Sequence, residues 1–202
     1  LPYDRCKIIT TSIRRKEMSF VVDCIIGIDV GKSGGISVYK PNSVTQVIKM
    51  PDNLMDLKEF FEYQKEISGN VLVFLEKQQR RPTDNEHFGK SIRVDALLQD
   101  YERLKTILEF AQVPFALVHP RKWQVYLNLD LKRKKGDKPE EYADRKRRFK
   151  NVAQSFYPDV NVALWNADSL LITYFGRHIL MSDPNWVKAN VPKTMHDKLK
   201  LF

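Results

Sequence analysis

The feature that most constrains this sequence is the wholly apolar run Val71-Leu-Val-Phe-Leu75, which ends in the carboxylate of Glu76. An apolar run of this length that follows the turn signal Gly69-Asn70 is typical of a central strand buried on both faces. The run Cys24-Ile-Ile-Gly-Ile28 has the same character and ends in Asp29. If the two strands are neighbours, we expect both carboxylates at the same edge of one sheet.

The rest of the pattern predicts one mixed α/β domain at 21–181, with a basic arm or leader at 1–20 and a tail at 182–202. The leader is either an ordinary basic arm or the remnant of an organelle transit peptide. Three antiparallel strands are followed by parallel strands with helical crossovers, which gives a five-stranded sheet flanked by helices. Besides the two runs above, we expect strands at 36–40, 44–50 and 114–118 and helices at 54–64, 92–112, 123–127, 149–156 and 166–180.

The acids at the strand ends predict a metal site. Burying an ionised carboxylate is costly, and two carboxylates close together also repel each other. A divalent cation relieves both costs, and Mg²⁺ prefers oxygen ligands. Asp168, at the start of the last predicted helix, is a third candidate ligand. Its alternative role is that of an acid favoured by the positive end of the helix dipole.

The segment Gly27-Ile-Asp-Val-Gly31 followed by Lys32-Ser33 invites two other interpretations. A P-loop requires glycine at the position of Ile26, so that motif is excluded. The segment also resembles the first phosphate motif of actin-like ATPases and sugar kinases. Those proteins need a second nucleotide-binding half, which one short domain does not supply.

The charge of the chain favours a polyanionic partner, with nucleic acid first and an anionic membrane surface second. Lys and Arg number 34 against 25 Asp and Glu, for a net charge of +9. The segment 132–150 carries ten basic and four acidic residues, so it holds most of this excess. A charge run of this kind is either a solvated face or a phosphate-binding surface. The chain contains no apolar run long enough to span a bilayer, and its two cysteines indicate a reducing compartment.

Five segments in this order resemble the ribonuclease H-like superfamily, and within it the RuvC-like Holliday junction resolvases. The first is Gly27-Ile-Asp-Val-Gly31 with Gly34-Gly35, and the second is Val73-Phe-Leu-Glu76. The other three are Gly89-Lys-Ser91 leading into Tyr101-Glu-Arg-Leu-Lys105, Val118-His-Pro-Arg-Lys-Trp123, and Ala167-Asp-Ser-Leu-Leu171.

The resemblance implies a ribonuclease H-like fold and an endonuclease that resolves Holliday junctions or other branched DNA. It implies two Mg²⁺ ions per active site, for which Mn²⁺ can substitute, and phosphodiester hydrolysis that leaves 5′-phosphate and 3′-hydroxyl ends. Asp29, Glu76 and Asp168 are the implied catalytic acids and metal ligands. The open alternatives are a related nuclease acting on RNA–DNA hybrids or flaps, and a catalytically weak protein that binds branched DNA.

The resemblance also implies a homodimer, because a four-way junction is nearly two-fold symmetric and needs two incisions. The long helix at 92–110 is the expected dimer element, although a helix that only fills the core would show the same apolar stripe. No membrane partner is expected. The implied location is the cytoplasm or nucleoid of a bacterium or phage-infected cell, or else an organelle.

One position departs from the family. These resolvases usually carry a fourth acid three residues before the last one, where this chain has Trp165, followed by Asn166. Either Asn166 serves as a weak metal ligand, or water does, or the second metal binds weakly.

The segment after Glu76 and the basic residues are the expected DNA contacts. His87 and Phe88 act as a wedge at a branch point, or they belong to a plain polar loop. The basic residues expected to contact DNA are Lys32, Lys77, Arg80, Arg81, Lys90, Lys122, Lys132, Arg133, Lys134, Lys135, Arg145, Lys146, Arg147 and Arg148.

Overall fold

The computed structural model describes residues 22–80, 88–130 and 140–199. The predicted arm at 1–20 and the last three residues lie outside the described part of the chain. The elements, in chain order, are β1 (Cys24–Asp29), β2 (Gly35–Tyr39), β3 (Gln46–Lys49), α1 (Leu54–Ser68), β4 (Val71–Glu76), α2 (Phe88–Phe110), β5 (Phe115–Val118), α3 (Pro120–Tyr126), α4 (Tyr142–Phe156), α5 (Ala167–Ser182), α6 (Pro184–Asn190) and the 3₁₀ helix η2 (Lys193–Lys198).

The five strands form one sheet in the order β3-β2-β1-β4-β5. The β1–β2 and β2–β3 pairs are antiparallel, and the β1–β4 and β4–β5 pairs are parallel. This arrangement confirms the predicted five-stranded mixed sheet, in which three antiparallel strands are followed by parallel strands. Ile28 pairs with Leu75 across the β1–β4 ladder, so Asp29 and Glu76 follow as neighbours where the two strands end.

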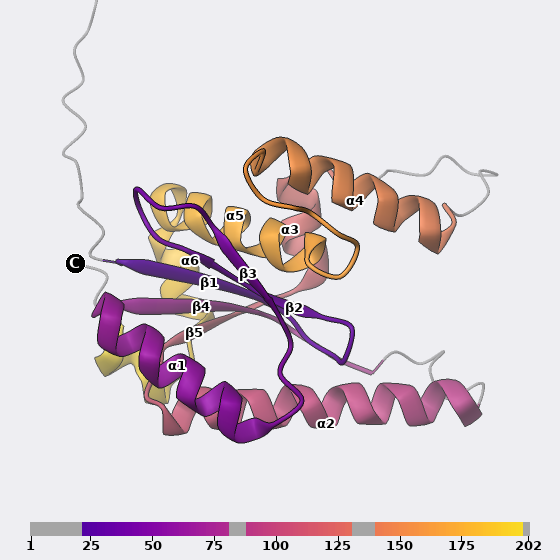
Figure 1. The fold of residues 1–202 in the computed structure, drawn as a ribbon. Helices are drawn as coiled ribbons and strands as arrows, with labels where there is room; N and C mark the ends of the chain where they lie inside the picture. The colour runs from indigo at the N-terminus through magenta and orange to yellow at the C-terminus, as the bar shows by residue number, and fades with distance from the viewer. Residues whose placement is uncertain (1–21, 81–87, 131–139, 200–202) are drawn as a thin grey trace, which may run out of the picture.

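Helices cover both faces of the sheet (Figure 1). Helices α1 and α2 lie on one face, and α3, α4 and α5 lie on the other. β4 is buried along its whole length, as expected for a strand covered on both sides. On the α5 face, the rings of Phe74 and Phe175 meet edge to face at 6.4 Å. In the described ranges, no helix combines the length and apolar character needed to cross a bilayer.

Helix α5 approaches β1 closely because Gly27 has no side chain. A Cβ atom at Gly27 would lie 2.3 Å from Oγ1 of Thr173 and 2.5 Å from the carbonyl oxygen of Ser169. At this contact the buried hydroxyl of Ser37 on β2 donates to the Ser169 carbonyl at 2.7 Å. The register of α5 on the sheet is thereby fixed, which brings the first turn of α5, including Asp168, to the ends of β1 and β4.

Several elements differ from the sequence-based expectations. α2 begins at Phe88 rather than 92, and α4 begins at Tyr142 rather than 149. The early turns of α4 are rich in charge, but their spacing still places Phe149 and Ala153 in the core. The segment after Ser182, which has no clear sequence pattern, folds into α6 and η2 and buries Val187 and Met195.

Candidate functional site

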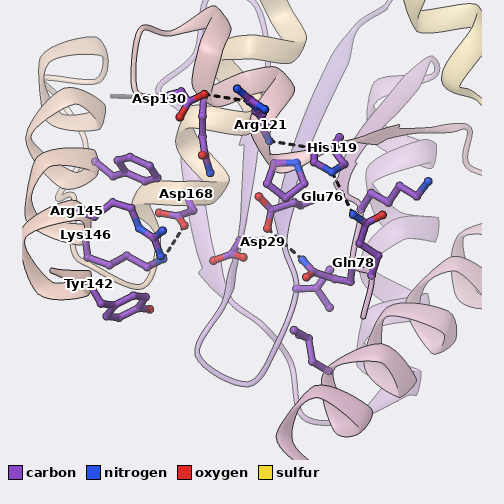
Figure 2. Close-up of a pocket in the computed structure, with 17 residues that line it drawn as sticks. Asp29, Glu76, Gln78, His119, Arg121, Asp130, Tyr142, Arg145, Lys146 and Asp168 are labelled. Carbon is purple, nitrogen blue, oxygen red and sulfur yellow. Dashed lines mark hydrogen bonds and ion pairs between the residues drawn. The ribbon is translucent and has the colours of Figure 1, made fainter. Parts of the chain in front are cut away.

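Asp29, Glu76 and Asp168 line one pocket of about 600 Å³ at the ends of β1 and β4 (Figure 2). Asp29 closes β1, Glu76 closes β4, and Asp168 lies in the first turn of α5. The three acids are 47 or more residues apart along the chain, and only the fold brings them together. The pocket therefore concentrates negative charge in a partly desolvated place.

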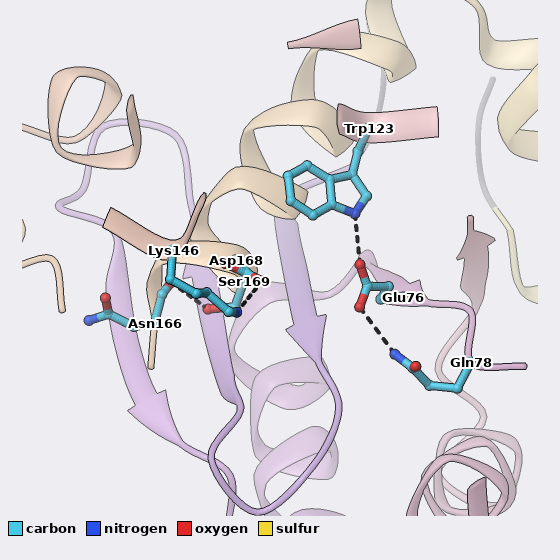
Figure 3. Close-up of polar contacts among 7 residues, drawn as sticks. All are labelled: Glu76, Gln78, Trp123, Lys146, Asn166, Asp168 and Ser169. Carbon is cyan, nitrogen blue, oxygen red and sulfur yellow. Dashed lines mark hydrogen bonds and ion pairs between the residues drawn. The ribbon is translucent and has the colours of Figure 1, made fainter. Parts of the chain in front are cut away.

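Glu76 is held by two hydrogen bonds from neutral donors (Figure 3). The indole Nε1–H of Trp123 donates to its Oε1 at 2.9 Å, and the amide of Gln78 donates to Oε2 at 3.1 Å. Burial raises the pKa of Glu76, while these hydrogen bonds oppose the rise, and the net pKa stays above its ordinary value. The two donors fix the direction of the carboxylate without neutralising it.

Asp29 is the most strongly perturbed acid of the pocket. Burial raises its pKa well above the ordinary value, and repulsion from Asp168 and Glu76 raises it further. Lys146 opposes these effects only in part. The repulsion raises the pKa because the three carboxylates share one pocket.

Lys146 supplies the positive charge inside the pocket. Its ammonium, from α4, lies 2.6 Å from Oδ2 of Asp168, and both side chains are largely buried (19% and 11% exposed). Burial lowers the pKa of Lys146, but the charge and hydrogen bond of Asp168 and the charge of Asp29 outweigh burial, so the net pKa is raised. Lys146 is therefore protonated at neutral pH, and it neutralises only part of the acidic charge.

The donor set suits a hard divalent cation. Oδ1 of Asp168 is buried and has no hydrogen-bond partner, and carboxylate oxygens are the ligands that Mg²⁺ prefers. In their present positions, however, the side chains of the described residues do not form a cluster of three His, Cys, Asp or Glu groups ready to hold an ion. A cation bound at Asp168 would therefore compete with the ammonium of Lys146.

The rim of the pocket is polar and largely basic. Arg145 lies over the ring of Tyr142, with 5.4 Å between the guanidinium carbon and the ring centroid. Arg121, which also lines the pocket, donates to Asp130 at 3.1 Å. A pocket with carboxylates at its base and cations on its rim suits a substrate that is itself anionic, because the rim attracts the charge that the base repels.

Several residues predicted to contact metal or DNA lie elsewhere. Asn166 does not line the pocket. Its Oδ1 accepts from the backbone of Ala163 at 2.8 Å, and its Nδ2 donates to the Asn161 carbonyl at 3.1 Å. The loop before α5 thus engages both ends of the Asn166 amide, and the assignment of Asn166 as a weak metal ligand stays a prediction. Lys32 lines a different cavity, next to α1 and α2.

The remaining predicted DNA contacts divide into four groups. Lys77, Arg145 and Lys146 line the pocket. Arg80, Arg147 and Arg148 form ion pairs, with Asp95, Asp144 and Glu140 respectively. Lys90 lies in the first turn of α2, and Lys122 faces a second groove beside β5. Arg81, Lys132, Arg133, Lys134 and Lys135 lie outside the described residues, as does His87.

The sequence-based reasoning did not foresee the contacts of three residues in or beside the pocket. They are Trp123 and Gln78, which hold Glu76, and His119, which caps α3 by accepting from the backbone of Arg121 at 3.2 Å. The signal for Trp123 was present, because it lies in the segment Val118–Trp123 directly after a parallel strand. Its bond to a strand-end acid depends on how α3 packs, which the segment alone does not specify.

The fold is similar to that of two solved structures of RuvC from Thermus thermophilus. For RuvC in complex with a Holliday junction substrate, the TM-score is 0.45 at 13% sequence identity, over 77% of this chain and 95% of that chain. For the second RuvC structure, the TM-score is 0.44 at 16% identity, over 77% of this chain and 96% of that chain. No family model matches this sequence, and no curated protein matches it.

Proposed function

We propose that this chain is a divalent-metal-dependent endonuclease that cuts branched DNA, with the Holliday junction as its substrate. The observation that carries the proposal is the convergence of Asp29, Glu76 and Asp168 in one pocket with a basic rim. The preference for junctions rests on the five sequence segments that resemble RuvC-like resolvases.

Asp29, Glu76 and Asp168 are the residues that would hold the metal, and the buried, unpartnered Oδ1 of Asp168 supports this assignment. Mg²⁺ or Mn²⁺, proposed as two ions per site, would supply Lewis-acid catalysis and an activated water for phosphodiester hydrolysis. The protein's own contribution is positioning. Trp123 and Gln78 orient Glu76, and the cations of the rim attract the phosphate backbone.

A homodimer is part of the proposal, because two symmetric cuts require two pockets. The first half of α2 supports it. Ile92 is 52% exposed, and Leu97 and Leu98 are only half-buried, whereas Leu104 and Leu108 farther along the helix are in the core. Sedimentation of the wild-type chain and of an Ile92→Glu variant tests this assignment, and a wild-type monomer in the presence of junction DNA would contradict it.

The experiment for the nuclease uses a labelled four-way junction with Mg²⁺ or with EDTA. We expect the wild-type chain to cut only with Mg²⁺, and Asp29→Asn to abolish cutting while the thermal melt shows a folded protein. Asp159→Asn, an exposed acid outside the pocket, is the matched control and should cut normally. Equal cleavage of junction, flap, RNA–DNA hybrid and plain duplex would overturn the junction preference but not the nuclease.

The ion pair between Lys146 and Asp168 favours a second candidate, a protein that binds branched DNA with weak or no catalysis. In that case Lys146 is the permanent counter-ion of the pocket. Junction binding without cleavage in either Mg²⁺ or Mn²⁺ would select this candidate over the nuclease.

A further inference from the structure

A second concavity lies beside the acidic pocket and shares one wall with it. This groove, of about 760 Å³, is lined by residues of α2, β5, α3 and the C-terminal segment that begins at α6. Lys77 and His119 line both concavities, so the groove and the pocket meet at the ends of β4 and β5. We call it the C-terminal groove.

Four lysines line the C-terminal groove against a single acid, Glu109. Lys77, Lys122 and Lys193 are exposed and have no acidic partner in the described ranges of the chain. The fourth, Lys105, is already paired with Glu102 at 2.8 Å. Three uncompensated lysines around one concave surface create a positive field that favours a polyanion.

Consecutive residues of α3 serve different surfaces. Arg121 lines the acidic pocket, Lys122 faces the C-terminal groove, and Trp123 points inward to Glu76. This division follows from the helix, because successive residues point in directions about 100° apart. A ligand that contacts Lys122 therefore lies next to the element that holds Glu76.

Trp186 from α6 fixes the position of Lys122. The ammonium lies 5.2 Å from the centre of its ring, and the ring also packs edge to face on Phe175 at 5.5 Å. Because Lys122 lies over the indole and Phe175 packs against it, the Trp186 ring forms part of the groove wall and is not a free surface for base stacking. These contacts favour recognition of phosphates, which does not depend on base sequence, over base stacking.

We infer that the C-terminal groove binds the phosphodiester backbone of the substrate away from the bond that is cut. The inference rests on the proposed function for the identity of the substrate. It gives the segment after α5 a role, since Trp186 and Lys193 belong to that segment. Because Lys77 and His119 join the two surfaces, one nucleic acid can follow both without a break.

The test compares two double variants that remove the same charge. Lys122→Gln with Lys193→Gln changes the groove, whereas Lys188→Gln with Lys198→Gln changes exposed lysines of the same C-terminal segment that do not line it. Binding to a labelled junction is measured by fluorescence anisotropy in EDTA across a salt series, and thermal melts check folding.

We expect the groove variant to bind the junction more weakly than the wild type. The slope of its log affinity against log salt should be less negative by up to about 1.8, because each lost phosphate contact changes the slope by about 0.9. The control variant should keep the wild-type slope. Long-armed and short-armed junctions should differ less in affinity for the groove variant than for the wild type, since the groove contacts backbone away from the cut.

Equal salt slopes for the two variants would overturn the proposal that the groove binds nucleic acid. A wild-type chain that binds no nucleic acid would overturn it as well. An acidic protein partner in the groove would give the first of these results. The outcome for the nuclease is separate. If the chain cuts DNA with Mg²⁺ but the two variants have equal salt slopes, the nuclease proposal stands and the groove proposal fails. If the groove variant has a smaller salt slope but the chain does not cut, the groove proposal stands and the nuclease proposal fails.

Discussion

The ammonium of Lys146 lies 2.6 Å from Oδ2 of Asp168, inside the pocket that also holds Asp29 and Glu76. One lysine faces three carboxylates, so the pocket keeps an excess of negative charge. A buried ion pair gains little net stability, but breaking it leaves an uncompensated charge. The pair therefore links two measurable quantities, the stability of the fold and the affinity of the pocket for cations.

Replacing Lys146 should make the pocket more dependent on metal. In EDTA we expect Lys146→Met to lower the free energy of unfolding by about 3 kcal/mol, the cost of breaking a buried pair. Mg²⁺ should then raise the melting temperature more than in the wild type, with its half-maximal effect at a lower concentration, because the competing ammonium is gone. Lys150→Met, one turn later on α4, is the control. The same Mg²⁺ response in both variants would show that Lys146 does not compete with a cation.

Asp29 should make the metal-free protein less stable as the pH rises. Burial and the charges of Asp168 and Glu76 raise its folded-state pKa, so the folded state holds its proton more tightly than the unfolded state. The resulting penalty begins near the ordinary carboxyl value of about 4 and is complete above the raised pKa. In EDTA, Asp29→Asn should therefore melt higher than the wild type at neutral pH, and the difference should shrink toward low pH. Asp159→Asn should follow the wild-type curve, and a pH-independent difference for Asp29→Asn would contradict this account.

Trp123 should act as a positioning residue through Glu76. In the wild-type chain the Trp123 ring lies 5.4 Å from the Phe149 ring, centre to centre. Trp123→Phe keeps an aromatic ring at this position but removes the hydrogen bond to Oε1 of Glu76. A hydrogen bond to a charged group contributes about 1.5–3 kcal/mol, so cleavage should slow by roughly tenfold or more. The acid limb of the pH–rate profile should also move to higher pH, because this hydrogen bond holds the pKa of Glu76 down.

The control for this prediction is Trp165→Phe, whose indole lies against Gly35 and makes no bond to Glu76. Its profile should keep the wild-type acid limb. A Trp123→Phe variant that lost rate without any shift of the limb would have only a packing role.

The sequence predicted the sheet well because its signals are local. The apolar runs that end in Asp29 and Glu76 mark the two central strands, and the glycines at 34 and 35 mark the turn between β1 and β2. The start of α4 was missed because Tyr142–Arg148 carries five charges, and the helix there depends on packing of Phe149 that lies a turn or more away. Helix α6 was missed for a similar reason, since it packs against β5, which lies far away along the chain.

The sequence predicted the part of the site that lies at the ends of strands, but not the part that depends on helix packing. Asp29 and Glu76 are brought together by the parallel register of β1 and β4, which the sequence pattern indicates. The position of Lys146 depends on how α4 lies against α5, and no local pattern encodes that packing. Asn166 has the right type of oxygen beside Asp168, but its amide bonds to the loop before α5 instead.

The basic residues of α4 should divide into those that bind DNA and those that hold the fold. Arg145 lines the pocket and has no ion-pair partner in the described ranges, so its charge is available to a phosphate. Arg148 is engaged with Glu140 at 2.8 Å and with the Leu129 carbonyl at 3.0 Å.

Arg145→Gln should reduce the steepness of the salt dependence of junction binding by about 0.9 and leave the melting temperature unchanged. Arg148→Gln should keep the slope and lower the free energy of unfolding by about 1–2 kcal/mol, because it removes charge-assisted hydrogen bonds. Anisotropy across a salt series and thermal melts measure the two effects, with Arg103→Gln on α2 as the control for charge alone. Equal slopes for Arg145→Gln and Arg148→Gln would show that α4 attracts DNA through its overall charge rather than through the unpaired arginine at the pocket.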